Sequence, residues 1–269
     1  MDVRGHGSPP VPPRAPSPDA AARIAELAAL DDEADGATVR RIYDDWAPTY
    51  DDEDVAALFG YPSPERVADR VASLVPPDTD VLDAACGTGL VGAALAARGF
   101  RSVDGLDLSP AMIRRARRRR AYHDLGPADL RREVPGAAAK FGVVTCVGAL
   151  GPGHLGPAAL GGLVRVLRPG GLLVLATADD VWAAGPYAAA VQRLVDGGHV
   201  RPVDGSDDGS DDGSDDGSDD GSDDGSDRDP HDDRDHGDRS DRGDTGPRRL
   251  VVLAAREVPG PGRSVAWWS

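Results

Sequence analysis

The stretch VLDAACGTGLVG, residues 81–92, has the pattern of a buried strand, a glycine-rich turn and the start of a small-residue helix. Residues 87–92 formally satisfy G-x-G-x-x-G, in which backbone amides and a helix N-terminus hold the pyrophosphate of a dinucleotide. Taken alone, this match is weak. Because ligands of an open parallel sheet bind outside the carboxyl ends of its strands, the turn marks the expected binding site but not its ligand.

Two aspartates narrow the choice of ligand. Asp83 ends the strand ahead of the glycines, where its charge would repel a pyrophosphate and favour a ligand with a positive amino group. Asp107 ends the next expected strand, 20 residues after Gly87, where a carboxylate can bind both ribose hydroxyls. Since such a carboxylate serves NAD and other nucleosides alike, the pattern predicts a ribose and disfavours NAD without identifying the cofactor.

Strands and helices alternate from this turn onward. The expected strands are 80–84, 102–107, a weak proline-interrupted strand that ends at 128–130, 141–150, 172–177, 199–203 and 248–255. The expected helices between them are 90–98, 110–122, 155–167 and 186–195. Continuous apolar strands separated by helices indicate an α/β fold, a Rossmann-like open, mostly parallel sheet with helices on both faces. Three amphipathic helices, at 20–30, 37–46 and 64–74, are expected to precede the sheet.

Composition divides the chain into further segments. Prolines crowd residues 1–19, and residues 204–246 consist of five GSDD copies and a ragged Asp/Arg/His tail without any apolar residue, so both segments are predicted to be disordered. The expected organisation is a proline-rich N-terminus at 1–19, N-terminal helices at 20–79, a core at 80–203, an acidic insert at 204–246, a final strand at 247–258 and a tail at 259–269.

The net charge of −16 comes almost entirely from the insert. That segment has 19 Asp and 4 Arg, which leaves 27 acidic and 26 basic residues elsewhere. Calcium binding is disfavoured because the segment has no Glu to close a calcium loop. No apolar run approaches the length of a membrane span, so the chain is predicted to be cytoplasmic. Cys86 and Cys146 are expected to be reduced, with no disulfide framework and no metal site.

Five motifs in this order resemble those of class I S-adenosylmethionine-dependent methyltransferases, over roughly residues 37–200. They are VLDAACGTGL (81–90), GLDLSPAMI (105–113), ADL (128–130), FGVVTCVGAL (141–150) and VLRPGGLLVLAT (166–177). Within that superfamily, YDDWAPTYDDED (43–54), ACGTGLVG (85–92) and VGALGPGHLGP (147–157) look like the methyltransferase-like proteins named for the Williams-Beuren syndrome region and their bacterial relatives.

The resemblance implies S-adenosylmethionine as the cofactor and a role for each matching position. Asp83 would orient the methionyl amino group directly or through water, Asp107 would bind the ribose hydroxyls, and Asp129 would accept a hydrogen bond from the adenine amino group. Tyr43, Trp46 and Tyr50 would belong to an N-terminal lid. The other cofactor-binding residues that it implies are Ala85, Cys86, Gly87, Gly89, Leu108, Met112, Leu130 and Val147.

The acceptor half of the reaction stays open. Methyl transfer from a sulfonium mainly requires alignment of donor and acceptor, and a catalytic base is optional. A small-molecule acceptor is expected, because the motifs of nucleic-acid base methylation are absent from the sequence. His154 is a base, a substrate contact or a surface residue. The alternatives are an inactive S-adenosylmethionine-binding or interaction protein and, third, an NAD-dependent oxidoreductase.

Three local features of the sequence lead to further expectations. The arginine run 114–120 is expected to be a solvated helix face, and the acidic insert is hypothesised to contact and screen it from nucleic acid. Gly142 stands where relatives usually have Asp, and is expected to loosen the start of its strand. Pro127 is expected to shorten the third strand.

Overall fold

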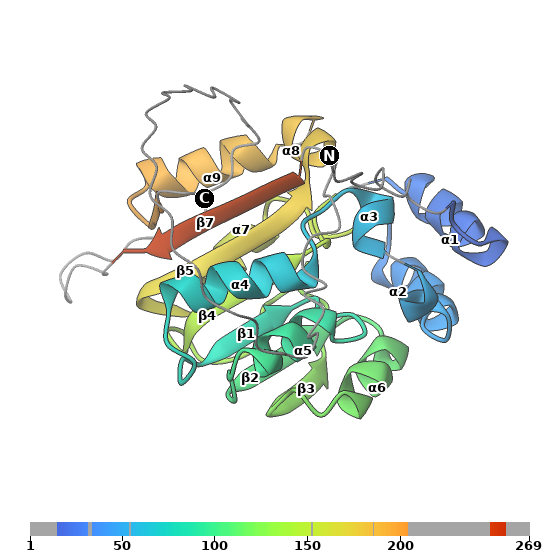
Figure 1. The fold of residues 1–269 in the computed structure, drawn as a ribbon. Coiled ribbons are helices and arrows are strands. Elements are labelled where there is room, and N and C mark those ends of the chain that lie inside the picture. Colours follow the sequence, from blue (N-terminus) through green and yellow to red (C-terminus); the bar gives the residue numbers. More distant parts are fainter. Residues whose placement is uncertain are drawn as a thin grey trace, which may run out of the picture. The chain divides into compact units, whose positions relative to one another are not determined.

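A mixed β-sheet organises the computed structural model of this protein (Figure 1). The structure describes residues 15–31, 34–53, 55–151, 153–184, 186–203 and 248–256, and the expected insert at 204–246 lies outside them. Within these residues, seven strands form one sheet in the order β3-β2-β1-β4-β5-β7-β6. The strands are β1 Val81–Ala84, β2 Val103–Asp107, β3 Asp124–Pro127, β4 Phe141–Val147, β5 Leu167–Ala178, β6 Val200–Pro202 and β7 Arg248–Ala255.

The first strand lies between two parallel neighbours. Ala84 at the end of β1 pairs with Leu106 on one side and with Cys146 on the other. The carboxyl ends of β1, β2 and β4 therefore share one edge of the sheet, and the order of the strands reverses there. Only β7 pairs antiparallel, with β5 and β6, among the described strands. The predicted Rossmann-like, mostly parallel fold is confirmed.

Helices cover both faces of this sheet (Figure 1). Helices α4 Pro64–Leu74 and α5 Leu90–Ala97 pack on one face, and α7 Ala159–Arg165 and α9 Tyr187–Asp196 pack on the other. Side chains alternate between the two faces along each strand, so that Val143 packs on the α4/α5 side and Val144 on the α7/α9 side. No described helix is long and apolar enough to cross a membrane.

The N-terminal helices build a small core of their own. Helices α1 Pro18–Ala28 and α2 Gly36–Trp46, the single turn η1 Tyr50–Asp52 and helix α3 Val55–Phe59 surround Trp46, which is fully buried. The Asp35 carboxylate caps α2 by accepting a hydrogen bond from the Thr38 amide at 2.7 Å. Helix α6 Pro110–Arg118 contacts α2 and thereby joins these helices to the sheet. We call residues 36–53 the lid.

Element boundaries differ from the expectation where local stereochemistry intervenes. Helix α1 begins inside the segment expected to be disordered, because the Ser17 hydroxyl accepts a hydrogen bond from the Ala20 amide. Strand β3 ends at Pro127 instead of reaching residue 130, and β4 ends before Gly148, whose φ is 63°. Periodicity also missed η1, α3 and α8 Asp179–Ala184, which are too short to show a pattern.

Gly142 does not loosen strand β4. Its amide donates to the Asp80 carbonyl at 2.9 Å, and the chain passes so close to its neighbours that a Cβ at this position would lie 2.5 Å from Cγ2 of Thr79. The strand has a register irregularity between Phe141 and Val143 that accompanies this close approach. The glycine is therefore required by packing, which corrects the expectation from sequence.

Candidate functional site

The turn after β1 reverses direction through left-handed backbone. Ala85, Gly87 and Gly89 have φ values of 59°, 54° and 88°. Glycine adopts this conformation without steric cost, whereas Ala85 does so at roughly 1 kcal/mol or more. A Cβ at Gly87 would meet nothing within 4 Å, so this face of the turn opens onto free space. The backbone here can approach a ligand closely.

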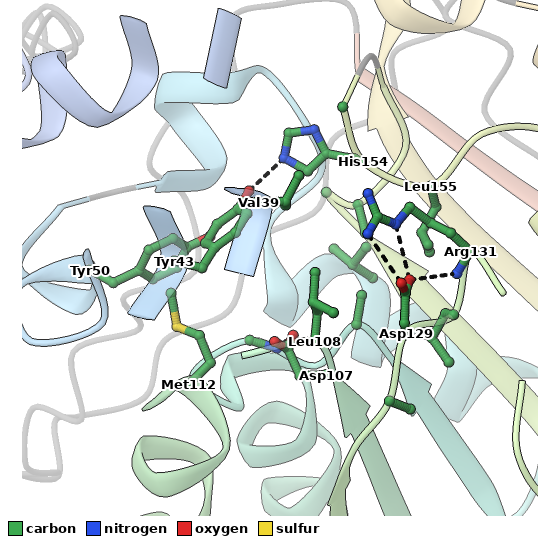
Figure 2. A pocket seen from close by; sticks show the side chains of 18 residues that line it. Val39, Tyr43, Tyr50, Asp107, Leu108, Met112, Asp129, Arg131, His154 and Leu155 are labelled. Atoms are coloured by element: carbon green, nitrogen blue, oxygen red, sulfur yellow. Dashed lines mark hydrogen bonds and ion pairs between the residues drawn. The ribbon is translucent and has the colours of Figure 1, made fainter. Parts of the chain in front are cut away.

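A pocket lies between this turn and the lid (Figure 2). Its cavity volume of about 90 Å³ is far below the roughly 300–1,000 Å³ of typical ligand sites. The residues expected at the site that line it are Tyr50, Ala85, Gly87, Asp107, Leu108, Met112, Asp129, Leu130 and Val147. Asp83, Cys86 and Gly89, which were also expected there, are not among the lining residues.

Asp107 is held firmly at the edge of the pocket. Its two carboxylate oxygens accept hydrogen bonds from the Gly87 and Ser109 amides, both at 2.8 Å. Burial raises the pKa of Asp107 to about 6, against the lowering effect of these two amides. A carboxylate has about four lone-pair sites, so the fixed side chain can still accept hydrogen bonds from ligand hydroxyls.

Asp83 lies beneath the turn and not in the pocket. Its side chain points to the α4/α5 face of the sheet and is 1% exposed. One oxygen accepts a hydrogen bond from the Tyr122 hydroxyl at 2.7 Å and the other from the Thr145 hydroxyl at 3.0 Å. Burial raises the pKa of Asp83 to about 6. The expectation that this carboxylate faces an incoming cation directly is corrected, because its side chain is buried and does not line the pocket.

Cys86 and Gly89 belong to the inner side of the turn. Cys86 is 7% exposed, and burial raises the pKa of its thiol well above the usual value, so it is not a thiolate nucleophile. A Cβ at Gly89 would come within 3.0 Å of the Ala116 side chain on helix α6. Both residues support the turn instead of lining the pocket.

Asp129 accepts hydrogen bonds from a neighbouring residue that the sequence did not indicate. Arg131 donates to its two oxygens from Nε at 3.0 Å and from Nη2 at 3.2 Å (Figure 2). Its Nη1 also donates to the Ala34 carbonyl ahead of the lid. Burial opposes ionisation of Asp129, but the hydrogen bonds and charge of Arg131 hold its pKa below the usual value. A ligand group at this position has to share the carboxylate with Arg131.

Aromatic residues of the lid close the opposite side. Tyr43 and Tyr50 line the pocket, whereas Trp46 packs behind them in the N-terminal core. The Tyr43 hydroxyl lies 2.6 Å from Nε2 of His154, which follows β4 (Figure 2). His154 is therefore a half-buried residue that lines the pocket. Burial raises the pKa of Tyr43, so its hydroxyl keeps its proton at neutral pH.

Two lid carboxylates fasten the lid to helix α6 and the turn. Asp44 accepts hydrogen bonds from the Ser109 hydroxyl at 2.6 Å and the Ala111 amide at 3.0 Å. Asp51 pairs with Arg115 at 3.2 Å and Arg119 at 2.8 Å. The arginine run is therefore not simply a solvated face, because two of its members hold the lid.

Comparison with known proteins identifies the domain that contains this site. The family profile described as a methyltransferase domain matches residues 81–171. The human methyltransferase-like protein 27 is 40% identical over 139 residues, which cover 50% of this chain and 56% of that protein. Residues 81–171 therefore form a methyltransferase domain, and these similarities support the class I S-adenosylmethionine-dependent methyltransferases as its superfamily. The chain spans about half the length of the curated relatives it matches.

Solved structures extend the comparison of this methyltransferase. A chain of the Haloferax volcanii complex that contains the Trm112 methyltransferase activator has the same fold, with a TM-score of 0.51 and 18% identity. The match covers 80% of the present chain and 98% of the Haloferax chain. The S-adenosylmethionine-bound CalS10 from Micromonospora echinaspora, an amino pentose methyltransferase, is 37% identical, with coverages of 42% of this chain and 48% of its own and a TM-score of 0.36.

The match to a methyltransferase domain agrees with S-adenosylmethionine as the expected cofactor. The pocket fits it, because Asp107 offers a carboxylate for hydroxyls, Gly87 leaves open space at the turn, and Leu108 and Met112 offer apolar surface. Arg131, Asp51 and Tyr122 are the residues that sequence reasoning missed. The sequence could have indicated Asp51, because it lies inside the motif at 43–54. Tyr122 lies in none of the motifs, so the sequence did not indicate its role.

Proposed function

We propose that this chain transfers the methyl group of S-adenosylmethionine to a small-molecule acceptor by in-line displacement. The observation that carries the proposal is a single pocket with a fixed carboxylate, Asp107, at the strand ends and a hydrogen-bonded Tyr43–His154 pair on the lid side. The first feature suits the nucleoside of the donor. The second suits an acceptor that loses a proton.

The donor would lie along the carboxyl ends of the strands. Asp107 would accept hydrogen bonds from the ribose hydroxyls, and Leu108 and Met112 would pack beside the adenine. Asp129 would accept a hydrogen bond from the adenine amino group while it keeps Arg131, with the Leu130 amide beside it. The methionyl end would follow the turn at Ala85 and Gly87 and pass Val147, with Tyr50 above it.

The acceptor half of the proposal concerns His154. Among the residues that line the pocket, the acidic side chains are Asp107 and Asp129, and the one cationic side chain, Arg131, is already paired. A carboxylate acceptor would meet no free positive charge there, so an alcohol, phenol or amine fits better. As the acceptor atom bonds to the methyl carbon, the sulfur–methyl bond breaks with its electron pair left on sulfur, and the acceptor proton passes to the imidazole.

Calorimetric titration with S-adenosylmethionine, S-adenosylhomocysteine and NAD tests the donor half. We expect binding of both sulfur compounds and none of NAD; tight NAD binding without a response to either sulfur compound would overturn the proposal. Asp107→Ala should abolish this binding, whereas Asp104→Ala on the same strand, whose carboxylate pairs with Lys140 outside the pocket, should not. Transfer of a tritiated methyl group to a panel of alcohols, phenols and amines tests the acceptor half. Binding without any transfer would favour a non-catalytic binding protein.

A further inference from the structure

One aromatic ring occupies the space that three glycines leave open. Tyr122, between α6 and β3, lies against the turn, helix α5 and strand β2. A Cβ would come within 2.9 Å of its ring at Gly89, 2.2 Å at Gly92 and 2.8 Å at Gly105. Of these, only Gly89 has a positive φ, so conformation does not explain the other two. The ring of Tyr122 accounts for Gly92, and at Gly105 it shares this role with Leu125, whose Cδ2 would lie 2.6 Å from the added Cβ.

This explanation changes the meaning of the G-x-G-x-x-G match. Gly92 supplies the last glycine of that pattern, and it lies inside helix α5, where glycine costs roughly 1 kcal/mol relative to alanine. Such a cost needs a compensating contact. The contact is the Tyr122 hydroxyl, which passes Gly92 to reach Asp83 at 2.7 Å. The third glycine serves a buried side chain in this chain, and no pyrophosphate is needed to account for it.

Asp83 is surrounded by groups that bear on its charge. The hydroxyls of Tyr122 and Thr145 donate to it, from the segment before β3 and from β4. The Gly92 amide of α5 also lowers the pKa of Asp83, while burial and the negative charge of Asp107 on β2 raise it, to about 6 overall. The remaining neighbours are the two buried thiols, Cys86 and Cys146, whose own pKa values are raised by burial and by Asp83. None of these groups is a cation.

We propose that Tyr122 is a positioning residue of the cofactor site, whose hydroxyl holds Asp83 as a buried anion beneath the turn and so favours the cationic methionyl end of S-adenosylmethionine. The inference rests on the proposed function and adds how the site selects its ligand. Asp83 acts through the field of its charge, because it is 1% exposed and does not line the pocket. In surroundings of low dielectric constant such a charge acts strongly over a few ångströms.

The test compares a charged and an uncharged ligand that share one nucleoside. S-adenosylmethionine carries a sulfonium and an ammonium group, whereas 5′-methylthioadenosine carries neither, and both present a ribose to Asp107. Calorimetric affinities of both ligands are measured from pH 5 to pH 8.5 for the native chain and for Tyr122→Phe. The variant keeps the ring, so the three glycines remain filled, and loses only the hydroxyl.

We expect Tyr122→Phe to move the pH midpoint of S-adenosylmethionine binding upward by about one unit, which weakens affinity about tenfold below that midpoint. Methylthioadenosine affinity should change less than about twofold, because Asp107 is untouched. The double variant Tyr122→Phe/Asp83→Asn should bind S-adenosylmethionine with the same affinity as Asp83→Asn alone. Thr145→Val, which removes the hydrogen bond from the other side, should repeat the shift and keeps the test available should Tyr122→Phe fold poorly.

Three results would overturn the inference: an unchanged pH profile in both hydroxyl variants, an equal loss of affinity for the two ligands, or native affinity in Asp83→Asn. Each differs from failure of the proposed function, in which the folded native chain itself would not bind S-adenosylmethionine at any pH. A purely structural role for Tyr122 would lower the melting temperature of the variant without separating the charged ligand from the uncharged one.

Discussion

Asp51 in the lid and Arg119, directly after helix α6, form an ion pair of 2.8 Å whose side chains are only 19% and 27% exposed. The same carboxylate accepts a hydrogen bond from the Thr88 hydroxyl at 2.5 Å, and Arg119 donates to the Thr88 carbonyl at 2.7 Å. Thr88 lies at the centre of the glycine turn. The lid is thus attached directly to the glycine turn, where we propose that the cofactor binds.

Release of the cofactor should depend on this attachment. Asp51→Asn removes the charge that pairs with Arg115 and Arg119, and the half-buried pairs are worth roughly 1 kcal/mol together after solvent screening. We expect S-adenosylhomocysteine to dissociate about three- to tenfold faster, as measured by stopped-flow displacement. Asp45→Asn is the matched control, because Asp45 pairs with Arg23 and Arg41, which both lie in the N-terminal helices. Equal rates for all three proteins would show that the ion pairs do not hold the lid.

Methyl transfer should respond to the Tyr43–His154 pair separately from cofactor binding. His154→Asn removes the imidazole that we propose as proton acceptor, and kcat should fall about 100-fold or more. Tyr43→Phe keeps the ring and loses the hydroxyl, so a smaller loss is expected. Calorimetry should find the affinity for S-adenosylmethionine within about threefold of the native value in both variants. An unchanged kcat in His154→Asn would contradict the role of the imidazole.

Stability should fall as pH rises through 6 because of Asp83. A buried carboxyl whose folded pKa is raised to about 6 contributes stability that is fully present below its unfolded pKa near 3.8 and is lost as pH rises through 6. Asp83→Asn should therefore stabilise the ligand-free chain at pH 8 by on the order of 1–3 kcal/mol. The gain should shrink as pH falls to 4. Thermal unfolding at several pH values measures it, and a gain that does not vary with pH would exclude this titration as its cause.

Gly92→Ala should destabilise the fold although alanine is the better helix former. The added Cβ would lie 2.2 Å from Cζ of Tyr122, and overpacking of this kind costs about 1–3 kcal/mol. Gly156→Ala is the control, because a Cβ there meets nothing within 4 Å and should change stability by less than about 0.5 kcal/mol. Urea unfolding compares the two variants. Native stability in Gly92→Ala would mean that the Tyr122 ring is free to shift.

The sequence by itself determined the sheet, the glycine turn and most of the pocket. Local rules suffice for these features, since apolar runs form buried strands and parallel strands bring their carboxyl ends to one edge. Asp107 could be placed for this reason, because it ends β2 beside the turn. The same rules failed for Asp83, which lies one residue before the end of β1, because the hydroxyls of Tyr122 and Thr145 hold its buried side chain beneath the turn.

Tertiary structure alone decided the contacts between distant segments. Tyr122 and Asp83 are 39 residues apart, Asp51 and Arg119 are 68 apart, and Tyr43 and His154 are 111 apart. No periodicity or motif links such pairs, because each depends on how the lid, helix α6 and the loop after β4 pack against one another. The sequence predicted a nucleoside site at residues 81–92, and the packing places the ring of Tyr122 against the third glycine and buries Asp83 beneath the turn.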